Sequence, residues 1–146
     1  MKVGDRTFKV HLDGYNLTDA LAGKAPGPRK EFFHFGDGGN LAALRLMQYK
    51  IVFQEQRAEG FDGWQERYST LRVPKIYNLR SDPFEAAGHS MDYDHWRADR
   101  LFLLVPAQQY VGQFLASFKE FPPSQKVGSF SLDQVLEALS SPKGNQ

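Results

Sequence analysis

The densest group of chemically capable side chains is the stretch His89-Ser90-Met91-Asp92-Tyr93-Asp94-His95. Its imidazoles and carboxylates are the ligand types of zinc sites and of 2-His-carboxylate iron sites. The spacing of His89, Asp92 and His95 matches no standard metal motif, however, and acidic residues here would also stabilise the start of a helix. We therefore favour a helix start, and keep a small metal hydrolase with these three ligands as an alternative.

Two further sets of polar residues are suited to binding an anion. His11 and Asp13 share one face if their segment is extended, where they either bind substrate or satisfy backbone groups at a turn. Guanidinium groups suit oxyanions such as sulfate, although a solvated loop is the simpler interpretation of clustered arginines. Residues 56–70 have the charged, irregular composition of a long surface loop, and this loop includes Trp64. The clustered arginines in and around the loop are Arg57, Arg67, Arg72 and Arg80.

The usual catalytic motifs are missing from the sequence. Residues 36–39, Gly-Asp-Gly-Gly, match neither G-x-G-x-x-G nor G-x-x-x-x-G-K-[ST], and they lie between two apolar runs, which predicts a hairpin turn. No G-x-S-x-G stretch is present, and the absence of cysteine excludes disulfides, thiolate metal sites and a cysteine nucleophile. The sequence therefore offers no complete active site.

The composition narrows the class of protein. Among 146 residues, 18 Lys or Arg stand against 17 Asp or Glu, which gives a net charge of +1 and argues against a nucleic-acid binder. The longest apolar run, residues 101–105, is much too short to span a membrane, and the first residues resemble no signal peptide. We expect one soluble domain, cytoplasmic or periplasmic, with neither nucleic acid nor membrane as a partner.

The first half of the chain predicts strands. Residues 7–12 predict a short strand, and residues 17–21 predict one helical turn ended by Gly23. Four further runs rich in aromatic and branched residues favour strands, at 31–35, 41–46, 50–55 and 75–79. Joined by short connections and one long loop, they predict an antiparallel meander with one buried face.

The second half of the chain predicts helices. Asp92 or Asp94 can cap a helix that extends through 101–105, where Pro106 should kink or restart it. An amphipathic stripe follows at Val111, Phe114, Leu115 and Phe118, and Ser131 opens a capping box before a last helix. The predicted fold class is α+β, a four-stranded antiparallel sheet packed against C-terminal helices. We expect an extended segment with a helical turn at 1–30, and an α+β unit at 31–146 with its sheet at 31–80 and its helices at 91–140.

Several segments, taken in order, resemble the type I sulfatases, the formylglycine-dependent branch of the alkaline-phosphatase-like superfamily. Residues 13–17 are similar to a D-G-x-x-L segment of that family. Residues 76–85 match its L-Y-D-L-x-x-D-P-x-E run, with Asn78 in place of the usual Asp. Further similarity, partly to a bacterial arylsulfatase subgroup, is found at 31–35, 43–45, 49–53, 102–108, 112–115 and 118–123.

The resemblance is to the C-terminal region of such an enzyme. The family's nucleophile, a formylglycine made within C/S-x-P-x-R, has no counterpart in the sequence. Formylglycine and calcium are therefore expected only in an N-terminal catalytic domain preceding Met1, and no cofactor is expected in this chain. The resemblance implies the C-terminal domain of an arylsulfatase-like sulfuric ester hydrolase, inactive alone, which leaves open whether this chain counts as an enzyme.

In that family the small C-terminal subdomain supports the catalytic domain and shapes one rim of the substrate cleft. The expected partners are the catalytic domain and, through an exposed apolar docking surface, further copies of this chain. A different hypothesis is a stand-alone module that binds a small anion or an aryl ligand with its aromatic strands and arginine-rich loop. Our candidates for rim residues are His11, Asp13, Arg57, Trp64 and Arg72.

Overall fold

The computed structural model describes residues 2–9, 14–36 and 38–122. The first of these parts holds a minimal hairpin of two short strands, β1 (Lys2–Val3) and β2 (Arg6–Thr7), and a single helical turn, α1 (Thr18–Leu21), follows. The main unit begins with four strands: β3 (Glu31–Phe35), β4 (Leu41–Leu46), β5 (Tyr49–Glu55) and β6 (Ser69–Asn78). The helices are η1 (Gly60–Trp64), η2 (Ala86–His89), α2 (Tyr93–Ala98), η3 (Leu101–Leu103) and α3 (Leu104–Glu120).

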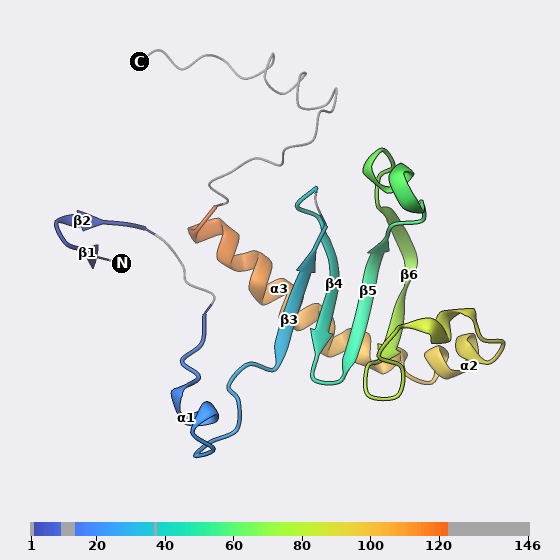
Figure 1. Ribbon diagram of the computed structural model, residues 1–146, viewed down its shortest axis with the longest axis horizontal. Helices are drawn as coiled ribbons and strands as arrows, with labels where there is room; N and C mark the ends of the chain where they lie inside the picture. Colours follow the sequence, from blue (N-terminus) through green and yellow to red (C-terminus); the bar gives the residue numbers. More distant parts are fainter. Residues whose placement is uncertain (1, 10–13, 37, 123–146) are drawn as a thin grey trace, which may run out of the picture.

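The four main strands form one antiparallel sheet in chain order, β3-β4-β5-β6 (Figure 1). One row of paired residues crosses the whole sheet, namely Phe33, Leu44, Ile51 and Ile76, and we call it the central row. Because α3 packs against one face of this sheet, the predicted α+β class is confirmed.

The face that carries the central row packs on α3, which crosses behind the strands in Figure 1. Leu44, Ile51 and Ile76 have no exposed surface, and Ala107 of α3 is 1% exposed against them. The small side chain at Ala107 lets the helix backbone approach the sheet closely. Pro106 falls in the first turn of α3, where its missing N–H has no helical partner to lose.

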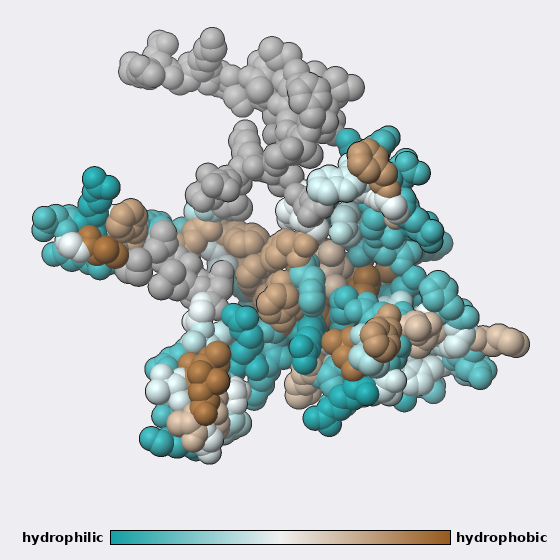
Figure 2. Space-filling model, viewed as in Figure 1, coloured by the Kyte–Doolittle hydropathy of each residue, from teal (hydrophilic) through white to brown (hydrophobic). Residues whose placement is uncertain are grey.

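The opposite face of the sheet is also partly buried, which corrects the prediction of a single buried face. Ala43, Val52 and Tyr77 form a second cluster with Tyr93 of α2, and Ala87 of η2 packs against it. The cluster forms because the chain after β6 turns back over this face instead of leaving the sheet edge. Figure 2 shows many hydrophilic side chains over the rest of the face.

Three other predicted elements have different bounds. The helix expected to extend from Asp92 to 105 is split into α2, η3 and α3, and Arg100 donates a hydrogen bond to the Trp96 carbonyl where α2 ends. Strand β6 starts at Ser69 and includes Pro74, which lies on a sheet edge beside a register shift. Of the strand expected at 7–12, only Thr7 is in a strand among the described residues. Residues 10–12 and the expected helix after Ser131 lie outside them.

Of the helices in the described parts of the chain, none combines the length and apolar character needed to cross a bilayer.

Candidate functional site

A groove of about 570 Å³ lies between β3, α3 and the segment that precedes β3. Small-molecule sites in proteins are usually concave spaces of roughly this size. The inner wall is β3, with Glu31, Phe32, Phe33 and Phe35; the floor is α3, with Tyr110, Gln113, Phe114 and Ser117; the outer wall is Gly14, Tyr15 and Arg29.

Stacked aromatic rings fix the floor of the groove to its inner wall. Phe33 of β3 faces α3, and its ring stacks on Phe114 with 4.1 Å between centroids. The ring centroids of Phe35 and Phe118 lie 5.8 Å and 5.0 Å from that of Phe114. Since strand residues alternate between faces, Phe32 instead faces away from α3 and is 47% exposed.

The outer wall is joined to β3 through polar and cation–π contacts. The Tyr15 hydroxyl donates a hydrogen bond to the Glu31 carboxylate. The Arg29 guanidinium lies 5.0 Å from the centroid of the Tyr15 ring and 5.9 Å from that of Phe32. The groove lining therefore combines aromatic rings with the charged groups of Arg29 and Glu31, which suits an amphipathic occupant.

A second polar group lies on the sheet face away from α3. Lys50 Nζ is 2.6 Å from Glu85 Oε1, and His34 lies near this pair on β3. Burial, reinforced by the positive charge of Lys50, lowers the pKa of His34, so its imidazole favours the neutral form. Among the described residues His34 Nε2 has no hydrogen-bond partner although it is buried.

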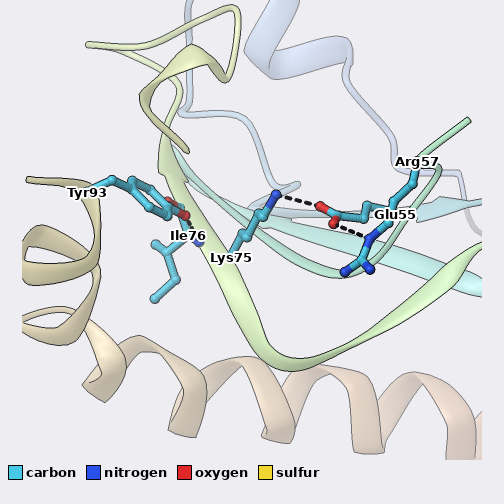
Figure 3. A network of polar contacts seen from close by, with 5 residues as sticks. All are labelled: Glu55, Arg57, Lys75, Ile76 and Tyr93. Atoms are coloured by element: carbon cyan, nitrogen blue, oxygen red, sulfur yellow. Dashed lines mark hydrogen bonds and ion pairs between the residues drawn. The ribbon is translucent and has the colours of Figure 1, made fainter. Parts of the chain in front are cut away.

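The predicted rim residues that the structure describes lie on the loop between β5 and β6 and on β6 itself, outside the groove. Figure 3 shows Glu55 between two cations: Arg57 Nε at 3.0 Å and Lys75 Nζ at 2.6 Å. The hydrogen bond from Lys75 is the main cause of the lowered pKa of Glu55. Trp64 in η1 is 83% exposed, and Arg72 is exposed on β6. The other two candidates, His11 and Asp13, lie outside the described residues.

The three alternative metal ligands are spread over η2 and the start of α2. His89, Asp92 and His95 are all exposed, and Asp92 occupies the N-cap position of α2 without a side-chain hydrogen bond to the helix. Within the described ranges, no three His, Cys, Asp or Glu side chains are gathered as a metal site. The geometry therefore gives the metal-hydrolase hypothesis no support.

Sequence reasoning missed the outer wall of the groove and part of its floor. Tyr15 and Arg29 are distant from α3 in sequence, and the polar residue Gln113 lies on the exposed side of the helical stripe. Phe114 was predicted only as part of an amphipathic helical stripe. A sequence signal for the groove could only have been the charged run Arg29-Lys30-Glu31, which leads into an aromatic strand. Such a run does not by itself predict a binding site.

Comparison with known proteins finds a similarity in structure. No family model and no curated protein match the sequence. The structure is similar to that of the PsFucS1 sulfatase from Pseudoalteromonas sp., with a TM-score of 0.50 and 21% sequence identity. The match covers 70% of this chain and 20% of that chain, so it involves about a fifth of the sulfatase. At this identity the likeness shows that the fold is sulfatase-like.

Proposed function

We propose that this chain is the C-terminal subdomain of a sulfatase-like sulfuric ester hydrolase, supporting a separate catalytic domain. The observation that carries the proposal is the fold match, which pairs most of this chain with a fifth of a sulfatase. The ordered motif resemblance, including residues 76–85, supports the same conclusion. The parent activity that best fits these motifs is aryl sulfate hydrolysis.

The chemistry of sulfate ester hydrolysis explains why a separate catalytic domain is part of the proposal. The reaction needs an activated nucleophile and positive charge where the sulfate oxygens gain negative charge. The sequence has no C/S-x-P-x-R segment to provide formylglycine. In the described parts of the chain, the hydroxyls of Ser81, Ser90 and Ser117 donate to backbone carbonyls and not to an imidazole. We therefore assign the nucleophile and the calcium site to the partner domain.

The loop between β5 and β6 is the proposed contribution to the rim of the substrate cleft. The Gln56 side chain braces this loop: Nε2 donates to the carbonyls of Gly63 and Glu66, at 3.1 and 2.8 Å, and Oε1 accepts from the Ala58 N–H at 3.0 Å. The brace holds the exposed Trp64 on an ordered turn. Together with Arg57, this arrangement supports a role in contacting an aromatic, anionic substrate.

An activity assay tests the proposal. The purified chain, supplied with calcium and a chromogenic aryl sulfate, should give no hydrolysis above the buffer control, whereas a complete sulfatase assayed in parallel should. Sustained turnover that co-purifies with this chain would refute the proposal. A C/S-x-P-x-R pentapeptide in frame upstream of Met1 would directly identify the partner domain.

The groove favours a second candidate function, a module that binds a small aryl ligand or anion. Its size and its aromatic lining are the supporting observations. Calorimetry with inorganic sulfate and with aryl sulfates separates the two functions. Saturable micromolar binding that is lost in Phe114→Ala favours the binding module. Injection heats no larger than the heat of dilution favour the subdomain.

A further inference from the structure

The two edges of the sheet differ in how their backbone groups are satisfied. In an antiparallel pair, residues alternate between bonding toward the neighbouring strand and pointing their N–H and C=O away from it. At an edge strand the outward groups need another partner. The central row connects the two edges, because it begins at Phe33 of β3 and ends at Ile76 of β6.

The β6 edge is closed by a side chain. The Tyr93 hydroxyl accepts a hydrogen bond from the Ile76 N–H and donates one to the Ile76 carbonyl, both at 3.0 Å (Figure 3). Pro74, two residues earlier, has no N–H to offer. A further strand therefore cannot pair at the centre of this edge.

The β3 edge is arranged differently. The Met47 N–H donates to the Lys30 carbonyl at 2.8 Å, which identifies this pair as bonded across β3 and β4. By alternation, Phe32 and His34 bond toward β4, whereas Glu31 and Phe33 point their N–H and C=O outward into the groove. Within the described ranges, no backbone group bonds to these outward groups.

We propose that the groove binds one extended segment of a partner polypeptide, which adds a fifth strand beside β3. The outward groups of Glu31 and Phe33 are the recognition element, because only an extended backbone matches their spacing. The floor of the groove then selects the side chains of the bound segment. Its residues that pair with Glu31 and Phe33 face Tyr110 and Phe114 and are therefore apolar, and the residues between them point away from α3 and are polar.

The outer wall determines that the occupant is a single strand. Tyr15 and Arg29 line the groove and are joined to β3 by the contacts described above. A second copy of this chain could pair its own sheet only by displacing this wall. The groove, of about 570 Å³, instead suits a single partner segment about as long as β3, which has five residues.

Amide hydrogen exchange on the full chain gives the first test. In the free protein the Phe33 amide should exchange faster than those of Phe32 and His34, which bond to β4. Addition of an acetylated heptapeptide of alternating valine and threonine should slow the Phe33 amide at least tenfold. Equal protection of Phe33 and His34 before any peptide is added would overturn the proposal, because the edge would already be occupied.

Peptide affinity gives the second test, with a matched pair of variants. E31P and E31A both lose the contact with Tyr15, but only E31P also loses an outward N–H, and proline is tolerated at the start of an edge strand. E31P should bind the peptide about fivefold more weakly than E31A, the effect of one hydrogen bond of about 1 kcal/mol. Equal affinities, or equal binding of a peptide whose valine nitrogens are methylated, would overturn the proposal.

This inference goes beyond the proposed function and can fail separately from it. Aryl sulfate turnover by the chain would refute the subdomain assignment and leave the strand-binding groove standing. If the peptide does not slow exchange of the Phe33 amide, the strand-binding groove is refuted and the subdomain assignment is unaffected.

Discussion

The Tyr93 hydroxyl replaces a neighbouring strand at the edge of the sheet by bonding both backbone groups of Ile76. Tyr93 is 5% exposed, and its ring stacks on Tyr77 and Trp96, so the hydroxyl is held in place from both sides. Burial raises the pKa of Tyr93, which keeps the hydroxyl protonated and able to donate. The polar link between α2 and the edge of the sheet therefore runs through the Tyr93 hydroxyl.

Tyr93→Phe should destabilise the protein by about 1–3 kcal/mol, because it leaves the Ile76 N–H and C=O buried without partners. The midpoint of urea unfolding should fall while its slope stays constant. Tyr110→Phe is the control, since its hydroxyl has no hydrogen bond among the described residues, and it should change stability by less than about 0.5 kcal/mol. A Tyr93→Phe midpoint equal to the wild type would contradict the bridging role.

Gly88 is required because Tyr77 approaches it closely. A Cβ added at Gly88 would lie 2.8 Å from the Tyr77 hydroxyl oxygen, and Tyr77 is 6% exposed, so its ring has little room to move. We expect Gly88→Ala to cost about 1–3 kcal/mol through overpacking.

A double-mutant cycle identifies the cause. In a Tyr77→Phe background, Gly88→Ala should be less harmful, because the atom that it meets is gone. An unchanged cost in that background would point to the backbone of η2 and not to the hydroxyl.

The stability of the protein should depend on the protonation of His34. Its pKa is lowered in the folded state by burial and by Lys50, so below the unfolded pKa of about 6.5 the unfolded state binds more protons. Stability should thus be fully present above that pH, and should fall as the pH drops toward the folded pKa. His34→Gln removes the titrating imidazole, so the midpoint of urea unfolding should depend less on pH between about 7 and 5 in this variant. An identical pH profile in this variant would exclude His34 as the titrating group.

Much of the fold follows from local patterns in the sequence. The aromatic run at 31–35 and the apolar run at 41–46 flank a glycine-rich turn, and they form the predicted hairpin of β3 and β4. The stripe that includes Val111 and Phe114 packs on the sheet as expected, but Leu115 is 47% exposed. Sequence periodicity does not predict contacts between residues that are far apart in the chain. Nothing in the sequence around Tyr93 indicates that its hydroxyl bonds to Ile76. The break between α2 and α3 was likewise not predicted.

The candidate site was harder to predict than the fold for the same reason. The groove combines Tyr15, β3 and α3, segments separated by long stretches of sequence. The outward direction of the Phe33 backbone depends on strand register, which the sequence leaves open by one residue. The loop residues Arg57 and Trp64 remain predictions as rim residues.

Gln56→Ala should loosen the loop that carries Trp64, because it removes three hydrogen bonds that brace residues 58–66. Trypsin cleavage after Arg57 and Arg67 should accelerate severalfold, while the free energy of global unfolding should fall by only about 1 kcal/mol, since the loop is largely exposed. Gln65→Ala is a matched control on the same loop, where the exposed amide has no side-chain hydrogen bond among the described residues. Equal cleavage rates for the two variants would show that Gln56 does not brace the loop.

The exposed apolar residues of η3 and of the start of α3 should cause self-association when the chain is isolated. Leu101, Phe102 and Val105 lie within about one turn and are 40%, 67% and 61% exposed. Burying the Phe102 ring between two copies should contribute roughly 1.5–3 kcal/mol, so Phe102→Ser should weaken dimerisation about tenfold or more. Light scattering over a range of concentrations measures this, with Met91→Ser, fully exposed on another segment, as the control. A wild-type chain that stays monomeric at high concentration would show that this surface does not self-associate, and only the catalytic domain would then remain as its proposed partner.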